Sequence, residues 1–490
     1  MPASPPLATR RAQLLLAGAL CLLLTTAWSA LQHPLLVVIA GLAPLALLGV
    51  LRFPFPVVLA FVAFSFFRLH EVVQPLYPLR IPQLLALGAL AALGWGLWQR
   101  QIRVYWRPEL TAFALFFMLV TLGLPLASNR GYAIDAWSAT YSKIGIMVLA
   151  IAWLAVDRAA FRLTARAVVA CGLLLGAVAL YNQANGIGLV EGTRVTIARN
   201  LGSMLGDPND LALTLLFPAS FALALLLTRG VRWYGRLAGL LCFVTVFAAI
   251  IATQSRGGLL GILAVSGVFA WRRVRSKTLL VLGGVLALGV LFALAGIDER
   301  ASGGAHEGGI DESAMGRIYA WGAAYRMALA HPLSGVGLNN FLANYWQYSA
   351  HWDGQNHAVH STWFGVLAET GFVGLAAFVT MVAVTVYLAR RSVLALGPER
   401  PGHVLEAYVM AQGVQAGLVG FLVSGTFLTM GFLWPFYILL ALAVAVGEFA
   451  RRLEAESQGA SQTANPPVPR GAAPPGPLPD VIGNGREKPF

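Results

Sequence analysis

The sequence predicts an all-α fold, a polytopic membrane helical bundle of about 12–14 transmembrane helices. Hydrophobic residues make up 58% of the 490 residues, whereas only 11% are charged. Apolar runs recur along the chain, and many approach the ~20 residues that a helix needs to cross a bilayer. Basic residues gather between these runs, as they do in the cytoplasmic loops of membrane proteins.

The apolar runs give the predicted spans in chain order. Two runs are only about 15 residues long and could be tilted or broken, which is why the predicted number of spans is a range. The runs lie near 13–31, 35–51, 54–68, 82–98, 109–127, 137–156, 164–185, 208–228, 237–254, 257–271, 278–296, 360–388, 404–427 and 431–450.

The basic clusters predict the orientation of the chain. Counted from a cytoplasmic start, they all fall on one side, so both termini are expected in the cytoplasm. The net charge of +13 lies largely in these loops, and because no soluble basic domain is visible, we expect no nucleic-acid partner. The clusters are Arg10/Arg11, Arg100/Arg103, Arg158/Arg162/Arg166, Arg229/Arg232/Arg236, Arg272/Arg273/Arg275/Lys277, Arg390/Arg391 and Arg451/Arg452.

One long loop, 297–359, is predicted on the opposite side of the membrane. Its segment "RIYAWGAAYRMALAHP" has the apolar spacing of an amphipathic helix that lies on or near the bilayer surface. We therefore divide the chain into N-terminal transmembrane helices (1–189), a candidate catalytic region that includes this loop (190–390), C-terminal transmembrane helices (391–452) and a tail (453–490). The tail is rich in Pro, Gly and Ser, a composition typical of disorder.

Arg256 is the first candidate site residue. It stands in "TQSRGGLLG", between two apolar runs, at the predicted outer end of a helix. An arginine at a helix N-terminus combines a fork of donors with free backbone N–H groups and a favourable dipole, which suits a phosphate or diphosphate. The alternative is an interfacial arginine whose side chain extends out of the bilayer.

Arg317 and Arg326 lie in the predicted surface helix of the long loop. Nine residues turn an ideal helix by about 900°, so these two side chains point to opposite faces. Both cannot hold one ligand unless the helix breaks. Arg317, nearest the expected helix start, is the better candidate for a catalytic role, and Arg326 remains a candidate for substrate binding or for a solvated role.

His360 lies where the long loop meets the next span, with His357 shortly before it. A histidine titrates near neutral pH and can act as a general base toward a hydroxyl. Together with His351 and Asp353 these histidines could instead form a metal site, but no HExxH or paired-carboxylate motif accompanies them, and we expect no metal.

Glu369 follows His360 by nine residues, about half a turn out of phase and ~13 Å deeper along an ideal helix. It is therefore a poor direct partner for His360. A buried carboxylate in a span usually pairs with a basic or polar group, so we expect a structural or site-organising ion pair, with a proton relay as the alternative.

The segment "NLGSMLGDPNDLALTLLFP" predicts a helix start. Asp207 is placed as the N-cap, the following proline suits the first helical position, and Asn209 lies in the first turn. Arg194 and Arg199 precede this segment on the same predicted outer face. They could contribute to an anion-binding site or simply be solvated.

Four segments, in this order, resemble the O-antigen ligase and O-antigen polymerase superfamily. "GDPNDLAL" is similar to that superfamily's Gly-x-Pro-Asn-x-x-Ala segment, and "SRGGLLG" is similar to its Arg-x-x-x-Leu motif. "GRIYAW…HPLSGVGLNNF" and "HSTWFGVLAETGFVG" resemble its long periplasmic loop and the histidine-containing helix after it. The resemblance covers mainly residues 190–390.

The resemblance implies an inverting transfer of a glycan from undecaprenyl diphosphate to an acceptor hydroxyl, on lipid A–core, a polysaccharide or a protein. The reaction would occur at the periplasmic face of the bacterial inner membrane, without a metal or another cofactor. By the same resemblance, Arg256 and Arg317 hold the diphosphate, and His360 activates or positions the acceptor hydroxyl. The predicted span number exceeds the twelve usual for the ligases, so the choice between ligase and polymerase stays open.

Two other functions compete with ligation. A polymerase would use the same diphosphate site to add a repeat unit to a growing lipid-linked chain. A transporter or flippase of lipid-linked or anionic glycans would instead line a path through the membrane with arginines, whereas Arg256, Arg317 and His360 are all predicted near one outer face.

Overall fold

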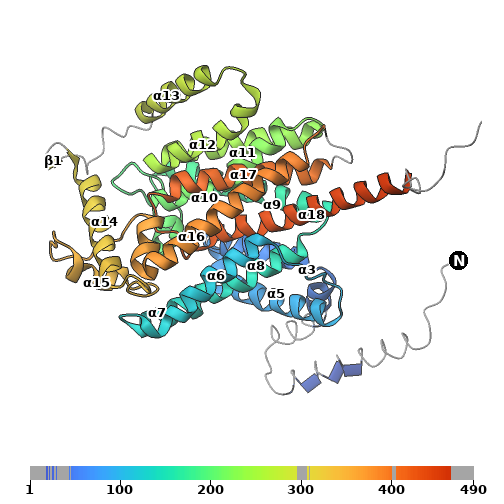
Figure 1. Ribbon diagram of the computed structural model, residues 1–490, viewed down its shortest axis with the longest axis horizontal. Helices are drawn as coiled ribbons and strands as arrows, with labels where there is room; N and C mark the ends of the chain where they lie inside the picture. The colour runs from blue at the N-terminus through green and yellow to red at the C-terminus, as the bar shows by residue number, and fades with distance from the viewer. Residues whose placement is uncertain are drawn as a thin grey trace, which may run out of the picture.

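The computed structural model is an α-helical bundle (Figure 1) that describes residues 51–294, 306–307, 310–399 and 404–464, with short stretches between 18 and 50. The predicted all-α class is confirmed. A hairpin of two-residue strands is the only sheet in the described part of the chain. The α-helices are α3 (Pro54–Ser65), α4 (Leu69–Val72), α5 (Ile81–Trp98), α6 (Pro108–Gly123), α7 (Arg130–Ala136), α8 (Ser142–Leu154), α9 (Arg158–Asn185), α10 (Pro208–Leu227), α11 (Trp233–Ala252), α12 (Arg256–Arg273), α13 (Lys277–Leu294), α14 (Glu312–Ala330), α15 (Phe341–Tyr348), α16 (Thr362–Ala395), α17 (Leu405–Gly425) and α18 (Trp434–Ala464).

Shorter elements join these helices. A π-helical turn, η3, links α7 to α8, and the strands β1 and β2 pair antiparallel just before α14. These elements are the 3₁₀ helices η1 (Gln74–Leu79), η2 (Leu124–Leu126), η4 (Arg199–Leu201) and η5 (Met204–Gly206), the π turn η3 (Trp137–Tyr141), and the strands β1 (His306–Glu307) and β2 (Ile310–Asp311).

Eight helices of the described residues are long and apolar enough to cross a membrane, or nine if the bent pair Ala46–Arg52 and Pro54–Ser65 forms one span. Every span predicted from residue 54 onward coincides with a helix. Most of the run near 13–31 and most of the run near 35–51 lie outside the described residues, so the number of spans stays a prediction. The eight are Ile81–Trp98, Pro108–Leu126, Arg130–Leu154, Arg158–Asn185, Pro208–Leu227, Trp233–Ala252, Thr362–Ala395 and Leu405–Gly425.

Helix α10 forms the centre of the bundle and packs against α9, α11, α12 and α17. Glycines let the neighbouring backbones approach it closely, which is how helices commonly associate in membranes. A Cβ on Gly239 of α11 would lie 2.7 Å from the carbonyl oxygen of Ala222, and one on Gly172 of α9 would lie 2.3 Å from Cβ of Pro218. The middle and second half of α10 are therefore held in a tightly packed core.

Helix α16 is interrupted at Gly371, whose φ of 68° lies in the left-handed region. The interruption leaves both carbonyl and N–H groups of α16 without helical partners, and a loop segment, 331–341, satisfies them. Val336 N donates to the carbonyl oxygen of Ala368 over 2.8 Å, and Phe372 N donates to that of Pro332 over 2.9 Å. The Gly-rich turn of the long loop is thus docked into the break of a spanning helix.

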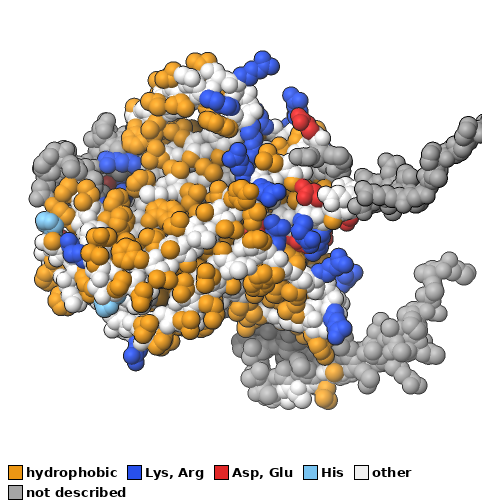
Figure 2. All heavy atoms as spheres, viewed as in Figure 1, with side chains coloured by type: hydrophobic (Ala, Val, Ile, Leu, Met, Phe, Trp, Pro, Cys, Tyr) orange, Lys and Arg blue, Asp and Glu red, His pale blue; other side chains and the backbone are white. Residues whose placement is uncertain are grey.

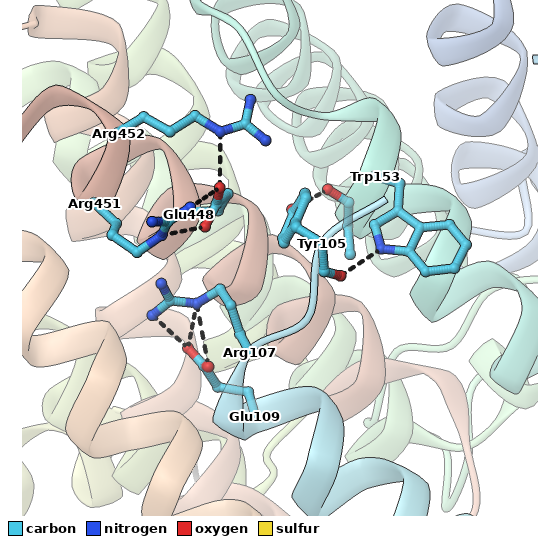
Figure 3. Close-up of polar contacts among 8 residues, drawn as sticks. Tyr105, Arg107, Glu109, Trp153, Glu448, Arg451 and Arg452 are labelled. Carbon is cyan, nitrogen blue, oxygen red and sulfur yellow. Dashed lines mark hydrogen bonds and ion pairs between the residues drawn. The ribbon is translucent and has the colours of Figure 1, made fainter. Parts of the chain in front are cut away.

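Arginine–carboxylate pairs fasten the end of the bundle at which α18 leaves it (Figure 3). Arg107 pairs over 3.2 Å with Glu109, which is fully buried at the start of α6. On α18, Glu448 accepts from Arg451 over 2.7 Å and from Arg452 over 2.8 Å. Figure 2 shows Lys and Arg side chains gathered toward this same end of the molecule.

Helix α18 continues to Ala464 and so extends beyond the boundary predicted at residue 452 into the segment expected to be disordered. The remainder of the predicted disordered tail, 465–490, lies outside the described residues.

Candidate functional site

A pocket lies at the opposite end of the bundle, near α14 (Figure 1). Its cavity volume is only about 20 Å³, and about 370 Å³ of empty space surrounds it when the adjoining open solvent is included. The starts of α10, α12 and α14 and the end of α17 contribute its walls. Its lining residues are Asn209, Ser255, Arg256, Gly257, Arg317, Ser424, Phe427 and Leu428. Two of the three predicted catalytic residues, distant in sequence, are therefore brought together.

Arg256 is the first residue of α12, as its sequence context predicts. Oγ of Ser255 caps the helix by accepting from Gly258 N over 3.2 Å. Gly258 is needed for packing, since a Cβ there would lie 2.6 Å from the side chain of Ala212. The positive end of the α12 dipole thus meets the pocket beside the Arg256 guanidinium.

Asp207 caps α10 with Pro208 at the first helical position, as predicted. Its Oδ1 accepts from the backbone N of Asn209 over 2.7 Å and of Asp210 over 3.2 Å. This cap fixes the turn from which the Asn209 side chain lines the pocket.

Arg194 is buried beside this turn and does not line the pocket itself. Its Nε donates to the carbonyl oxygen of Thr253 over 3.1 Å, and its Nη2 donates to Oδ1 of Asn209 over 3.0 Å. Burial lowers the pKa of Arg194, and nearby Arg256 lowers it further, whereas Glu191 and Asp207 raise it. Arg194 therefore has no direct contact with the pocket, but it holds the side chain of Asn209, which lines it.

Arg199 also lies outside the pocket lining, and its Nη1 donates to the carbonyl oxygen of Gly206 over 3.1 Å. The contact closes the short 3₁₀ turns that precede the cap of α10. Arg194 and Arg199 therefore both bind neighbouring protein groups close to the pocket. Neither of them forms part of the pocket wall.

Arg317 lines the pocket from α14, whereas Arg326 of the same helix does not. Nε of Arg326 donates to the carbonyl oxygen of Tyr348 over 2.6 Å, which ties α14 to α15. The two arginines thus contact different parts of the protein, which agrees with the prediction that they lie on opposite faces of the helix. The predicted helix start at Arg317 is wrong, because α14 already begins at Glu312.

One apolar face of α14 packs on protein, whereas Ile318, Tyr325 and Leu329 of the same helix are exposed, so its place on or near the bilayer surface stays a prediction. The residues of the packed face follow helical spacing and are fully buried in a small core with Val359 and Ala368. They are Ala320, Ala323, Ala324 and Met327. This packing holds the segment that carries Arg317 against α16.

His360 precedes α16, which begins at Thr362 rather than at the predicted residue 360. Its backbone has a left-handed φ of 45°, and the residue is exposed. Partial desolvation lowers the pKa of His360 from 6.5, Arg317 and His357 lower it further, and Asp207 raises it. His360 is not part of the pocket wall, but it lies within electrostatic reach of Arg317 and of the cap of α10.

His357 and His351 have separate partners. Nε2 of His357 lies 2.8 Å from Oδ2 of Asp353, and the pKa of Asp353 is lowered first by the backbone N–H of Gln355 and then by this contact. The ring of His351 stacks on Tyr319 with centroids 3.9 Å apart. Among the described residues, no three His, Cys, Asp or Glu side chains are grouped so that they could hold a metal.

Glu369 is buried in α16, but its partners are not the basic group that we expected. Its Oε2 accepts from Asn339 N over 2.8 Å, and its Oε1 accepts from Phe341 N over 3.3 Å. The carboxylate thus binds the backbone of the docked turn, and no ion pair of Glu369 occurs among the described residues. A contact with backbone N–H groups cannot be predicted from residue types, because every residue except proline has such a group. The Gly-rich "GVGLNN" does indicate a turn.

Two features of the site were not singled out from the sequence. Ser424 lines the pocket, and its buried Oγ has no hydrogen-bond partner within the described part of the chain. Asn340 connects the docked turn to α7, because its Oδ1 accepts from Asn129 N over 2.9 Å and from Oγ of Ser128 over 3.0 Å.

The comparisons with known proteins point to one family. Residues 241–379 match the family model described as O-antigen ligase, a segment that runs from α11 into α16 and contains Arg256, Arg317 and His360. No curated protein matches the chain. The family match together with the bundle of apolar helices indicates a multi-pass membrane protein of the ligase or polymerase type that acts on glycans. The match over residues 241–379 thus shows that this part of the chain is similar to the O-antigen ligase family and supports a relationship to that superfamily.

Proposed function

We propose that this protein transfers a glycan from undecaprenyl diphosphate to an acceptor hydroxyl, on lipid A–core, a polysaccharide or a protein, at the periplasmic face of the bacterial inner membrane. The observation that carries the proposal is the shared pocket of Arg256 and Arg317 at the N-terminus of α12. Two guanidinium groups and a helix N-terminus form a site suited to a diphosphate.

The diphosphate is the leaving group of the reaction. The acceptor oxygen attacks the anomeric carbon from the face opposite the diphosphate, and the carbon–oxygen bond to the diphosphate breaks with inversion. Arg256 and Arg317 neutralise the charge that develops on the departing oxygen, through charge-assisted hydrogen bonds. The hydroxyl of Ser424, which lines the same pocket, supplies a further polar contact.

His360 accepts the proton of the acceptor hydroxyl. Its lowered pKa keeps the imidazole neutral at pH 7, which is the form that a general base requires. Arg317 acts on both partners in this scheme, since it binds the diphosphate and also disfavours the imidazolium of His360.

The distribution of charge supports the proposed orientation. Basic side chains gather at the end of the bundle from which α18 leaves (Figure 2), whereas α14, which contributes Arg317 to the pocket, lies at the other end (Figure 1). By the positive-inside trend, the first end faces the cytoplasm, where the sequence also predicts both termini, so the pocket opens toward the periplasm.

The experiment uses the full chain, purified in detergent with EDTA, and a glycan on undecaprenyl diphosphate. With lipid A–core, polysaccharide or protein acceptors, we expect release of undecaprenyl diphosphate and formation of the glycosylated acceptor, both lost in Arg256→Gln. If the lipid-linked glycan itself becomes longer instead, the protein is a polymerase rather than a ligase. Absence of turnover with every acceptor, alongside movement of the donor across protein-containing vesicles, would overturn the proposal in favour of transport.

A further inference from the structure

A second, larger cavity lies at the end of the bundle opposite the pocket of Arg256 and Arg317. It measures about 460 Å³ and is enclosed by α9, the start of α11, the start of α17 and the loop between α10 and α11. This volume falls within the range of roughly 300–1,000 Å³ that is usual for small-molecule sites. Nothing in the proposed transfer reaction uses this cavity.

The cavity combines an apolar wall with a basic mouth. Val169 and Leu173 of α9 and Ala238 of α11 contribute apolar surface. Arg162 and Arg166 stand four residues apart and so share one face of α9. One acidic side chain lines the mouth, Glu406 of α17, and the lining arginines outnumber it.

The mouth of the cavity keeps a net positive charge after its one ion pair is counted. Nη1 of Arg162 lies 3.8 Å from Oε1 of Glu406, so these two charges offset one another. Arg166 and Arg232 line the same cavity from α9 and from the residue that precedes α11. Nη1 of Arg232 donates to the hydroxyl of Tyr234 over 3.1 Å, which orients the Arg232 guanidinium.

The start of α11 marks the depth of the cavity in a bilayer. Trp233 is 75% exposed and Tyr234 is 45% exposed, and aromatic side chains of this kind concentrate at the headgroup level of membranes. Leu237 and Leu241, further along α11, are also exposed and apolar. The basic mouth therefore lies beside the headgroups, and the apolar wall continues toward the acyl chains.

We propose that this cavity binds an anionic phospholipid of the cytoplasmic leaflet. Arg166 and Arg232 hold the headgroup phosphate, and an acyl chain lies along Val169, Leu173 and Ala238. Basic pockets between transmembrane helices on the cytoplasmic side favour such headgroups, and a guanidinium matches phosphate oxygens with paired donors. The bound lipid joins α9, α11 and α17, three helices that surround α10.

Lipid binding to the purified full chain tests the proposal by native mass spectrometry. Detergent-solubilised protein is titrated with phosphatidylglycerol, with phosphatidylcholine and with inorganic phosphate. We expect saturable binding of phosphatidylglycerol in preference to phosphatidylcholine. The double variant Arg166→Gln/Arg232→Gln should bind it more weakly, by about fivefold for each arginine removed.

Two further variants separate this cavity from general surface charge. Arg391→Gln removes an exposed arginine outside the cavity and should leave phosphatidylglycerol binding unchanged. Ala170→Trp adds bulk to the cavity lining without changing charge and should weaken binding. The proposal is overturned if Arg391→Gln weakens binding as much as the double variant does, if Ala170→Trp leaves it unchanged, or if inorganic phosphate competes as strongly as phosphatidylglycerol.

Discussion

Arg194 donates a hydrogen bond from its buried guanidinium to Oδ1 of Asn209 over 3.0 Å, and Asn209 lines the pocket of Arg256 and Arg317. A second donor of Arg194 binds the carbonyl oxygen of Thr253 at the end of α11. One side chain thus connects the start of α10 with the turn that leads into α12. The pocket depends on this connection because its walls come from helices far apart in sequence.

Arg194→Lys should weaken the site without removing its charge. A lysine presents one compact ammonium group and cannot reproduce the two separately directed contacts of the guanidinium. Loss of a hydrogen bond to a charged group costs about 1.5–3 kcal/mol, so the variant should melt at a lower temperature and bind the donor more weakly. Unchanged donor affinity and melting temperature would show that Arg194 does not organise the pocket.

Arg256→Gln and Arg317→Gln should each lower kcat by roughly 10²–10³, the usual effect of losing one preorganised electrostatic contact. Arg326→Gln is the matched control, because it removes the same charge from the same helix but outside the pocket. Initial rates of transfer, measured beside melting curves, separate lost chemistry from lost folding. Equal losses in Arg317→Gln and Arg326→Gln would argue against a specific role for the pocket.

The pH dependence of transfer should follow His360. Since the neutral imidazole is the active form and its pKa is lowered, activity should be retained below pH 6.5 and fall as the pH drops through that lowered value. Arg317→Gln removes a positive charge that lowers this pKa, so its residual activity should fall at a higher pH than in the unaltered protein. If activity in Arg317→Gln falls at the same acidic pH as in the unaltered protein, His360 is not the group whose titration limits activity.

Glu369→Gln should loosen the docked turn rather than abolish proton transfer. The amide keeps one acceptor oxygen in place of the two that bind Asn339 N and Phe341 N. We expect a loss of about 1–3 kcal/mol in the free energy of unfolding and faster hydrogen exchange at residues 335–341. Glu406→Gln removes a partly exposed carboxylate that lies near Arg162, and it should have a much smaller effect on stability. Loss of activity with unchanged exchange would favour the proton relay instead.

The helices and their caps could be predicted because their signals are local. Apolar length marks each span, and Asp207 before Pro208 marks the start of α10. Ser255, Arg256 and the glycines after them likewise mark the start of α12 within a few residues. Even the opposite directions of Arg317 and Arg326 follow from helical geometry alone.

The assembly of the site could not be predicted from local patterns. The pocket joins Asn209, Arg256, Arg317 and Ser424 through helix packing, and only the family resemblance suggested that two of them act together. The true partners of Glu369 are backbone N–H groups of a distant turn, which carry no signature in the residue types. Gly371 escaped notice because a glycine inside an apolar run does not reveal by itself that the helix breaks.

Binding of undecaprenyl diphosphate tests the central claim most directly, because it separates recognition of the leaving group from the chemistry of transfer. Affinities are measured for undecaprenyl diphosphate and undecaprenyl monophosphate with the unaltered protein, Arg256→Gln, Arg317→Gln and the double variant. If both arginines hold one diphosphate, the unaltered protein prefers the diphosphate, each single variant loses much of that preference, and the two losses are not additive. Equal affinity for both lipids in all four proteins would contradict the account.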